Sequence, residues 1–133
     1  FEKGEFACGD GCGYDDISLD LVDKLQMLRN LVGKPIHITS GCRCEAYNRY
    51  IGGVDNSPHL YGLAADIQVD DMPPLTLAVI ARWVNYIRIG IYPKHIHIDV
   101  KPPNPSKYWL VKNNKYIYSG KEKDLNKFLK KNL

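Results

Sequence analysis

The chain has 133 residues, of which 44% are hydrophobic and 25% charged, a composition typical of a globular protein that buries its own core. Its 18 basic and 15 acidic residues leave a net charge of +3, which is too small to predict nucleic-acid binding. At this length we expect one domain over residues 1–133. No apolar run approaches the ~20 residues of a membrane-spanning helix, so we expect no membrane span, and no signal peptide is visible.

The first 40 residues predict a helix followed by a strand. Apolar residues recur at three- and four-residue spacing between positions 21 and 32, so they share one helix face. Asp16 or Ser18 can cap the start of this helix, and Gly33 ends it. Residues 36–40 alternate apolar and polar side chains, which is typical of a strand buried on one side.

The middle of the chain predicts a long loop and then a second strand and helix. Residues 41–64 are rich in glycine and lack hydrophobic repeats, except for a short helix expected near 45–50. Residues 65–69 form an expected strand with alternating faces. Pro74 can occupy the first turn of a helix that we expect over 75–87.

The last third predicts short strands close together in sequence. We expect strands at 88–92 and 95–100, a hairpin of 108–111 and 115–118 around Asn113-Asn114, and a C-terminal helix with Leu125, Phe128 and Leu129 on its apolar face. Trp83 lies among apolar residues of the second predicted helix, so we expect it in the core. Without a regular βαβ alternation, the order of elements predicts an α+β fold with a mainly antiparallel sheet packed with helices.

Three of the four histidines lie in two short segments, at 57–66 and 95–99. The fourth, His37, lies alone on the polar face of a predicted strand. A surface or hydrogen-bonded role is the simpler expectation for a lone histidine of this kind.

Strand periodicity predicts that the clustered polar side chains face one another. Side chains two residues apart point the same way, so His95, His97 and Asp99 should share one side of their strand. If the two strands are neighbours, Asp66 and His97 can converge on one ion, and His59 can fold over from the preceding loop. Three protein ligands and an open fourth position are typical of a catalytic zinc site.

The pattern S-x-H-x-x-G-x-A-x-D followed by H-x-H-x-D resembles the zinc peptidases of the D-alanyl-D-alanine carboxypeptidase group, peptidase family M15, which have the Hedgehog/DD-peptidase fold. The resemblance extends from about residue 6 to about residue 109. It also includes Glu5 to Cys8, Ile38 to Arg43, Asn48 to Gly53 and Gly90 to Pro93. Several motifs in the same order make the match specific.

The resemblance implies that His59, Asp66 and His97 hold a single catalytic Zn²⁺. It also implies that Arg43 binds the carboxylate of a peptide substrate. A guanidinium group at the end of a strand, in a loop flanked by glycine, matches a carboxylate with two hydrogen bonds, which supports this role independently. The alternative for Arg43 is a surface salt bridge.

Three further side chains are candidates for the site. His95 resembles the family's second active-site histidine, which lies beside the metal and can stabilise an oxyanion or move a proton; the alternative is a residue that only supports a ligand or faces solvent. Asp99 is expected to orient a ligand histidine. Ser57 either hydrogen-bonds substrate or is a turn residue.

One position departs from the family pattern. Some members have a catalytic glutamate three residues before the last zinc ligand, where this chain has Lys94. Either His95 acts as the general base, or Asp70, Asp71 or Asp99 supplies a carboxylate.

These features predict a zinc-dependent peptidase that hydrolyses peptidoglycan stem or cross-link peptides, as a D-Ala-D-Ala carboxypeptidase or an endopeptidase. We expect a monomer that acts at the cell envelope or outside the cell, for instance as a phage-type lytic enzyme. The alternative is a non-catalytic zinc-binding module that recognises cell-wall peptides or a protein partner.

The four cysteines form two close pairs, Cys8 with Cys12 and Cys42 with Cys44. Disulfides, a second structural zinc site and reduced buried thiols all fit these spacings. We favour disulfides over a second zinc site and leave the pairing open. Any link between the pairs would hold the N-terminal segment against the loop that carries Arg43.

Overall fold

A computed structural model describes residues 1–85, 87–103 and 107–120. Its helices are α1 (Leu19–Val32), α2 (Glu45–Tyr50) and α3 (Pro74–Ala81), with 3₁₀ turns η1 (Lys3–Phe6) and η2 (Pro58–Tyr61). Its strands are β1 (His37–Ser40), β2 (Ala64–Gln68), β3 (Arg88–Ile91), β4 (Ile96–Asp99), β5 (Tyr108–Lys112) and β6 (Lys115–Gly120). None of the helices in these ranges has the length and apolar composition that crossing a bilayer requires.

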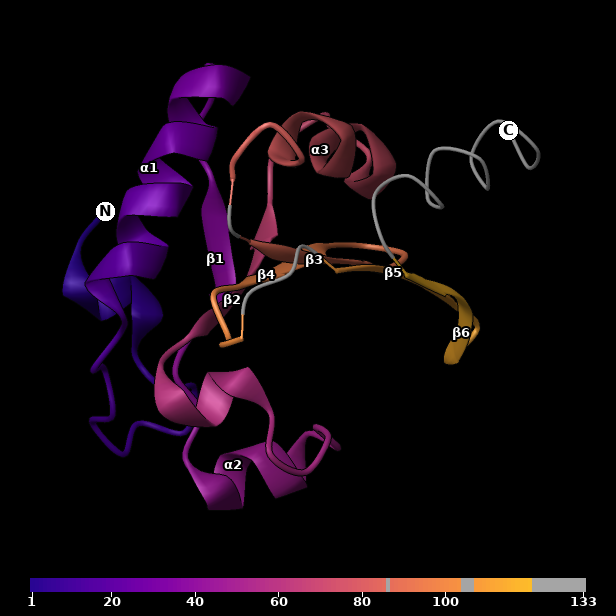
Figure 1. Cartoon of the computed structure of the whole chain (residues 1–133). Helices are drawn as coiled ribbons and strands as arrows, with labels where there is room; N and C mark the ends of the chain where they lie inside the picture. The colour runs from indigo at the N-terminus through magenta and orange to yellow at the C-terminus, as the bar shows by residue number, and fades with distance from the viewer. Residues whose placement is uncertain (86, 104–106, 121–133) are drawn as a thin grey trace.

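One sheet organises the described residues, with the strand order β1-β2-β4-β3-β5-β6. Four neighbouring pairs are antiparallel, and only β3 and β5 pair in parallel. Helix α3 lies on one side of the sheet and α2 on the other, while α1 stands beside β1 and contacts α3 (Figure 1). The predicted α+β fold with a mainly antiparallel sheet is therefore confirmed.

Helix α1 forms where the apolar spacing predicts it. The hydroxyl of Ser18 caps it by accepting the N–H of Leu21 at 3.3 Å, and Gly33 ends it in the left-handed conformation at φ 73°. Leu21, Leu25 and Leu28 are fully buried in the core. Burial of this leucine face is the main stabilising term for the helix.

Helix α3 ends earlier than predicted. It stops at Ala81 rather than near residue 87, because Trp83 and Val84 donate their N–H groups three residues back, to Ile80 and Ala81, and so form turns. This change of direction buries Val84 and leaves Trp83 70% exposed. The expected core position of Trp83 is therefore wrong.

The predicted hairpin is present. Strands β5 and β6 flank Asn113 and Asn114, whose φ angles of 53° and 59° suit the tight turn that asparagine tolerates. The helix predicted around Leu125, Phe128 and Leu129 lies outside the described residues.

All four cysteines are free. The Sγ atoms of Cys8 and Cys44 lie 3.9 Å apart, well beyond the ~2.05 Å of a disulfide bond. Our preference for disulfides is therefore wrong for this structure. Cys42 is a reduced thiol buried in the hydrophobic core.

Candidate functional site

Two adjacent strands and one turn bring the predicted ligands together. In the β2–β4 pair, Asp66 lies directly opposite His97, so both side chains project from the same face. His59 is supplied by η2, where the Ser57 hydroxyl accepts the His59 N–H at 3.3 Å. The backbone N–H of Arg43 donates to the His59 carbonyl at 3.0 Å and holds the turn against the end of β1.

The three side chains converge on one carboxylate oxygen. Asp66 Oδ1 lies 3.2 Å from His59 Nε2 and 3.1 Å from His97 Nδ1. One donor atom from each residue lies within 4.8 Å of the other two, and all three side chains are buried. This group can hold a metal ion, and the roles of its members as ligands stay predictions.

The second nitrogen of each ring already has an acceptor. His59 Nδ1–H donates to the carbonyl of Gly41, and His97 Nε2–H donates to the carboxylate of Asp99, each at 2.7 Å. Such contacts are typical of metal-binding histidines, because they fix the tautomer and the ring orientation. The predicted orienting contact from Asp99 to a candidate ligand is thus present.

These contacts leave the lone pairs of His59 Nε2 and His97 Nδ1 facing an anionic oxygen of Asp66. A neutral imidazole with one N–H committed elsewhere can only accept at its other nitrogen. Lone pairs at this spacing need a proton or a cation between them. The donor set therefore fits a metal such as Zn²⁺, which nitrogen and carboxylate ligands suit.

The ionisation of the group follows from its burial and its mutual contacts. Burial lowers the pKa of His59, an effect that the neighbouring carboxylate of Asp66 only partly offsets. Burial also lowers the pKa of His97, but Asp66 and Asp99 outweigh it and raise this pKa to about 9. Burial disfavours the Asp66 anion, yet hydrogen bonds from His59 and His97 hold its pKa well below the usual range. Without a metal, the proton on His97 balances the buried carboxylate at neutral pH.

Arg43 contacts the same carboxylate from the other side. Its Nη2 donates to Asp66 Oδ2 at 2.9 Å, its Nε to Ser40 Oγ at 3.0 Å and its Nη1 to Asn48 Oδ1 at 3.3 Å. The salt bridge foreseen as the alternative for Arg43 is thus present, but it is buried rather than at the surface. Two of its five N–H groups remain beyond these three bonds, on a side chain that lines the cleft.

His95 lies beside the cluster without belonging to it. It immediately precedes β4, which begins one residue later than predicted, and its ring stacks on Tyr92 with centroids 4.6 Å apart. His95 Nε2 is 3.9 Å from Asp66 Oδ2. Burial lowers the pKa of His95, which favours the neutral ring at pH 7.

Of the three carboxylates considered as alternative bases, only Asp99 lines the cleft. Asp70 and Asp71 are exposed and do not line the cleft, so neither can replace the missing glutamate. Lys94 is exposed at the surface. Among the described acids, only Asp66 and Asp99 line the cleft, and both are committed to histidines.

The cluster opens into a cleft of about 610 Å³ between the sheet and the segment that joins α2 to η2. Ser57 lines this cleft but acts structurally as the cap of η2, the turn role foreseen as its alternative. Three basic side chains lie along the cleft, those of Arg43, Arg88 and Lys107.

Sequence reasoning missed the aromatic wall of the cleft. Trp109 lies 5.3 Å from the His97 ring, and its Nε1–H donates to the Tyr92 hydroxyl at 3.0 Å. Both residues line the cleft. The parallel pairing of β3 with β5 brings Trp109 here, and no local pattern in the sequence signals that pairing.

The sequence is similar to known proteins. Residues 1–99 match the family model described as Peptidase M15. Over 75 residues, which are 54% of this chain, it is 42% identical to the zinc D-Ala-D-Ala carboxypeptidase of Streptomyces albus G, and the match spans only 29% of that protein. The family match covers most of the chain and includes the two histidine-bearing segments. The chain therefore belongs to the peptidase M15 family.

Proposed function

We propose that this chain is a zinc-dependent peptidase that hydrolyses peptidoglycan stem or cross-link peptides. The observation that carries the proposal is a buried His–Asp–His group, with both outer ring nitrogens hydrogen-bonded, at the base of an open cleft. The name of the Streptomyces relative supports a D-alanyl peptide as substrate class. A cell-wall substrate would place its action at the envelope or outside the cell.

The donor set supports three metal contacts. His59 Nε2, the Asp66 carboxylate and His97 Nδ1 would hold the ion. When bound, zinc polarises a scissile carbonyl and activates water for attack. Three protein ligands leave a coordination position for these groups.

The chain's other residues would bind substrate and move protons. Arg43 would hold a substrate carboxylate with the N–H groups that its protein contacts leave over. His95, neutral and facing the cluster, would accept a proton from the attacking water and return it to the leaving amine. The Trp109–Tyr92 wall would exclude water from one side of the peptide.

A second candidate, a non-catalytic module that binds wall peptides, is favoured by one observation. Lys94 stands where some family members have a catalytic glutamate, and no described carboxylate of the cleft is free to act as base. The two candidates differ in whether the protein hydrolyses the peptide that it binds, a reaction in which His95 would carry the proton.

Removal of a proposed ligand should weaken metal binding in the cleft. We expect His59→Ala to lower zinc affinity more than about 100-fold, because a ligand contributes at least as much as its supporting contacts. Zinc content after dialysis, measured by elemental mass spectrometry, checks this result. His37→Ala is the matched control, since His37 is exposed and contacts only Asp70 among its described ion-pair partners, at 3.2 Å. Equal zinc loss in both variants would contradict the ligand assignment.

Zinc binding should depend steeply on pH. With a pKa of about 9, His97 is protonated at pH 7 in the metal-free protein, and zinc requires the neutral ring. Apparent affinity should therefore rise about tenfold per pH unit from neutrality and level off above pH 9. Calorimetry in buffers of different ionisation enthalpy should show about one proton released at pH 7 for the zinc that binds in the cleft. An affinity that stays constant between pH 7 and pH 9 would exclude the protonated His97.

Hydrolysis should require His95. We expect His95→Ala to lower the rate of release of D-alanine or of new amino termini from purified peptidoglycan by about 10²–10⁴-fold, because it removes the proton carrier. Zinc content should stay normal, since His95 is not a member of the ligand group. Normal zinc content with no turnover of any wall peptide by the parent protein would instead favour the binding module.

Selectivity for a free carboxylate should depend on Arg43. Lysine keeps the charge but loses the paired hydrogen bonds, so Arg43→Lys should lower kcat/KM on free-acid peptides by about 10–100-fold. The rate on the matching C-terminal amides should change much less. Parallel assays of acid and amide, normalised to zinc content, separate this effect from any disturbance of Asp66. A parent protein that does not distinguish acid from amide would rule out the proposed contact.

A further inference from the structure

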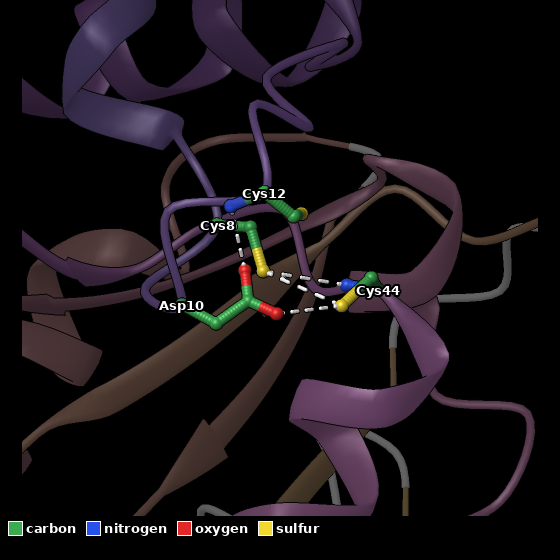
Figure 2. A group of neighbouring side chains, drawn as sticks. All are labelled: Cys8, Asp10, Cys12 and Cys44. Carbon is green, nitrogen blue, oxygen red and sulfur yellow. Dashed lines mark hydrogen bonds between the residues drawn. The ribbon is translucent and has the colours of Figure 1, made fainter.

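A second group of potential metal ligands lies outside the cleft. Cys8, Asp10 and Cys12 belong to the N-terminal loop, and Cys44 comes from the residue that precedes α2. One donor atom from each lies within 4.8 Å of all the others. Figure 2 shows the Cys8 thiol, the Asp10 carboxylate and the Cys44 thiol facing one another across the gap between the two segments.

Backbone contacts shape the N-terminal loop around this group. Cys8 donates its N–H to the Tyr14 carbonyl at 2.8 Å, and Gly11 donates to the Cys8 carbonyl at 3.2 Å. The turn needs the positive φ of 77° at Gly11, which glycine adopts without strain. Cys12 N–H then donates to Asp10 Oδ1 at 2.9 Å and fixes the carboxylate inside the loop.

The sulfur spacing fits a shared metal better than a disulfide. Cys8 Sγ and Cys44 Sγ are 3.9 Å apart. Two thiolates on a tetrahedral zinc with Zn–S bonds of ~2.3 Å are separated by ~3.8 Å, whereas disulfide sulfurs are ~2.05 Å apart. The second oxygen of Asp10 lies 3.1 Å from Cys44 Sγ, so the carboxylate needs little movement to join the same ion.

Backbone N–H groups are aimed at two of the sulfurs. Cys44 N–H donates to Cys8 Sγ at 3.5 Å, and Tyr47 N–H donates to Cys44 Sγ at 3.4 Å. Contacts of this kind orient the sulfur atoms, and the thiolate is the form of cysteine that binds metal. Cys42, the remaining thiol, is buried in the hydrophobic core and is not part of the group.

We propose that Cys8, Asp10, Cys12 and Cys44 bind a second Zn²⁺ in a closed, structural site. Three thiolates and one carboxylate complete a four-coordinate shell and leave no position for substrate, in contrast to the three-ligand group of the cleft. The site requires no peptidase activity and is independent of the proposed function.

This second ion would fasten the N-terminal loop to the segment that positions Arg43. Arg43 immediately precedes Cys44, and its side chain contacts the Asp66 carboxylate at 2.9 Å. The backbone bond from Cys42 N–H to the Phe6 carbonyl, 2.9 Å long, joins the same two segments two residues away. A structural zinc here would therefore stabilise one wall of the cleft from behind.

Metal stoichiometry tests the proposal on the full chain purified with reductant. We expect two zinc equivalents in the parent protein and one in Cys12→Ser. Cys12 is exposed, so its replacement leaves the core intact. Asp10→Ala, also at an exposed position, should retain the second zinc with weaker affinity against a competing chelator. Cys42→Ala is the matched control for loss of a thiol and should keep both equivalents.

Cobalt substitution separates the two sites. Co²⁺ bound by thiolates gives an intense ultraviolet charge-transfer absorption, which His59→Ala should retain and Cys12→Ser should lose. Four free thiols in the denatured, metal-free protein should accompany this result. A Cys8–Cys44 disulfide in the purified protein, found by peptide mass mapping, would overturn the proposal. So would cobalt binding without thiolate absorption while all four thiols are free.

Discussion

The buried carboxylate of Asp66 is the constraint around which the site is built. An anion removed from water is costly unless it is paired and hydrogen-bonded. Arg43, His59 and His97 supply those partners from the loop after β1, from η2 and from β4. Each of these segments must therefore pack correctly for β2 to keep its aspartate ionised. A divalent cation satisfies the same requirement more strongly than the proton of His97 and lets the His97 ring return to its neutral form.

The supports of this centre extend through the sheet to the far side of the cleft. Asp99 accepts from His97 and also lies 3.4 Å from Arg88, whose guanidinium is 5.3 Å from the Trp109 ring centroid. Trp109 fits here because Gly90 has no side chain: a Cβ at that position would lie 2.4 Å from the indole. Strands β3 and β5 thus fix both the orientation of one candidate ligand and the aromatic wall beside it. The backbone of β3 and β5 therefore helps to determine the geometry of the candidate metal site.

The local sequence pattern was sufficient to predict the features that depend on residues close together in the sequence. The leucine spacing of α1 predicted which of its faces is buried, and the spacing of the histidine segments located the candidate ligands. The features that were missed depend on residues distant in sequence. Trp109 reaches the cleft through a parallel strand pair, and the thiols of Cys8 and Cys44 meet across a separation of 36 residues. Trp83 was misplaced because an apolar stretch does not reveal where a helix gives way to turns.

The electrostatics of the cleft follow from its own lining, to which the exposed Lys94 does not belong. Among the described residues that line it, the two carboxylates are held by histidines and arginines, while Lys107 adds a further cation. The accessible surface is therefore biased toward anionic ligands, and the nearest uncommitted titratable group is His95. Burial keeps that ring neutral at physiological pH, which is the state a proton acceptor requires. A cleft of this kind does not need a carboxylate base if the histidine beside the metal carries the proton, and its positive lining would then act in substrate binding.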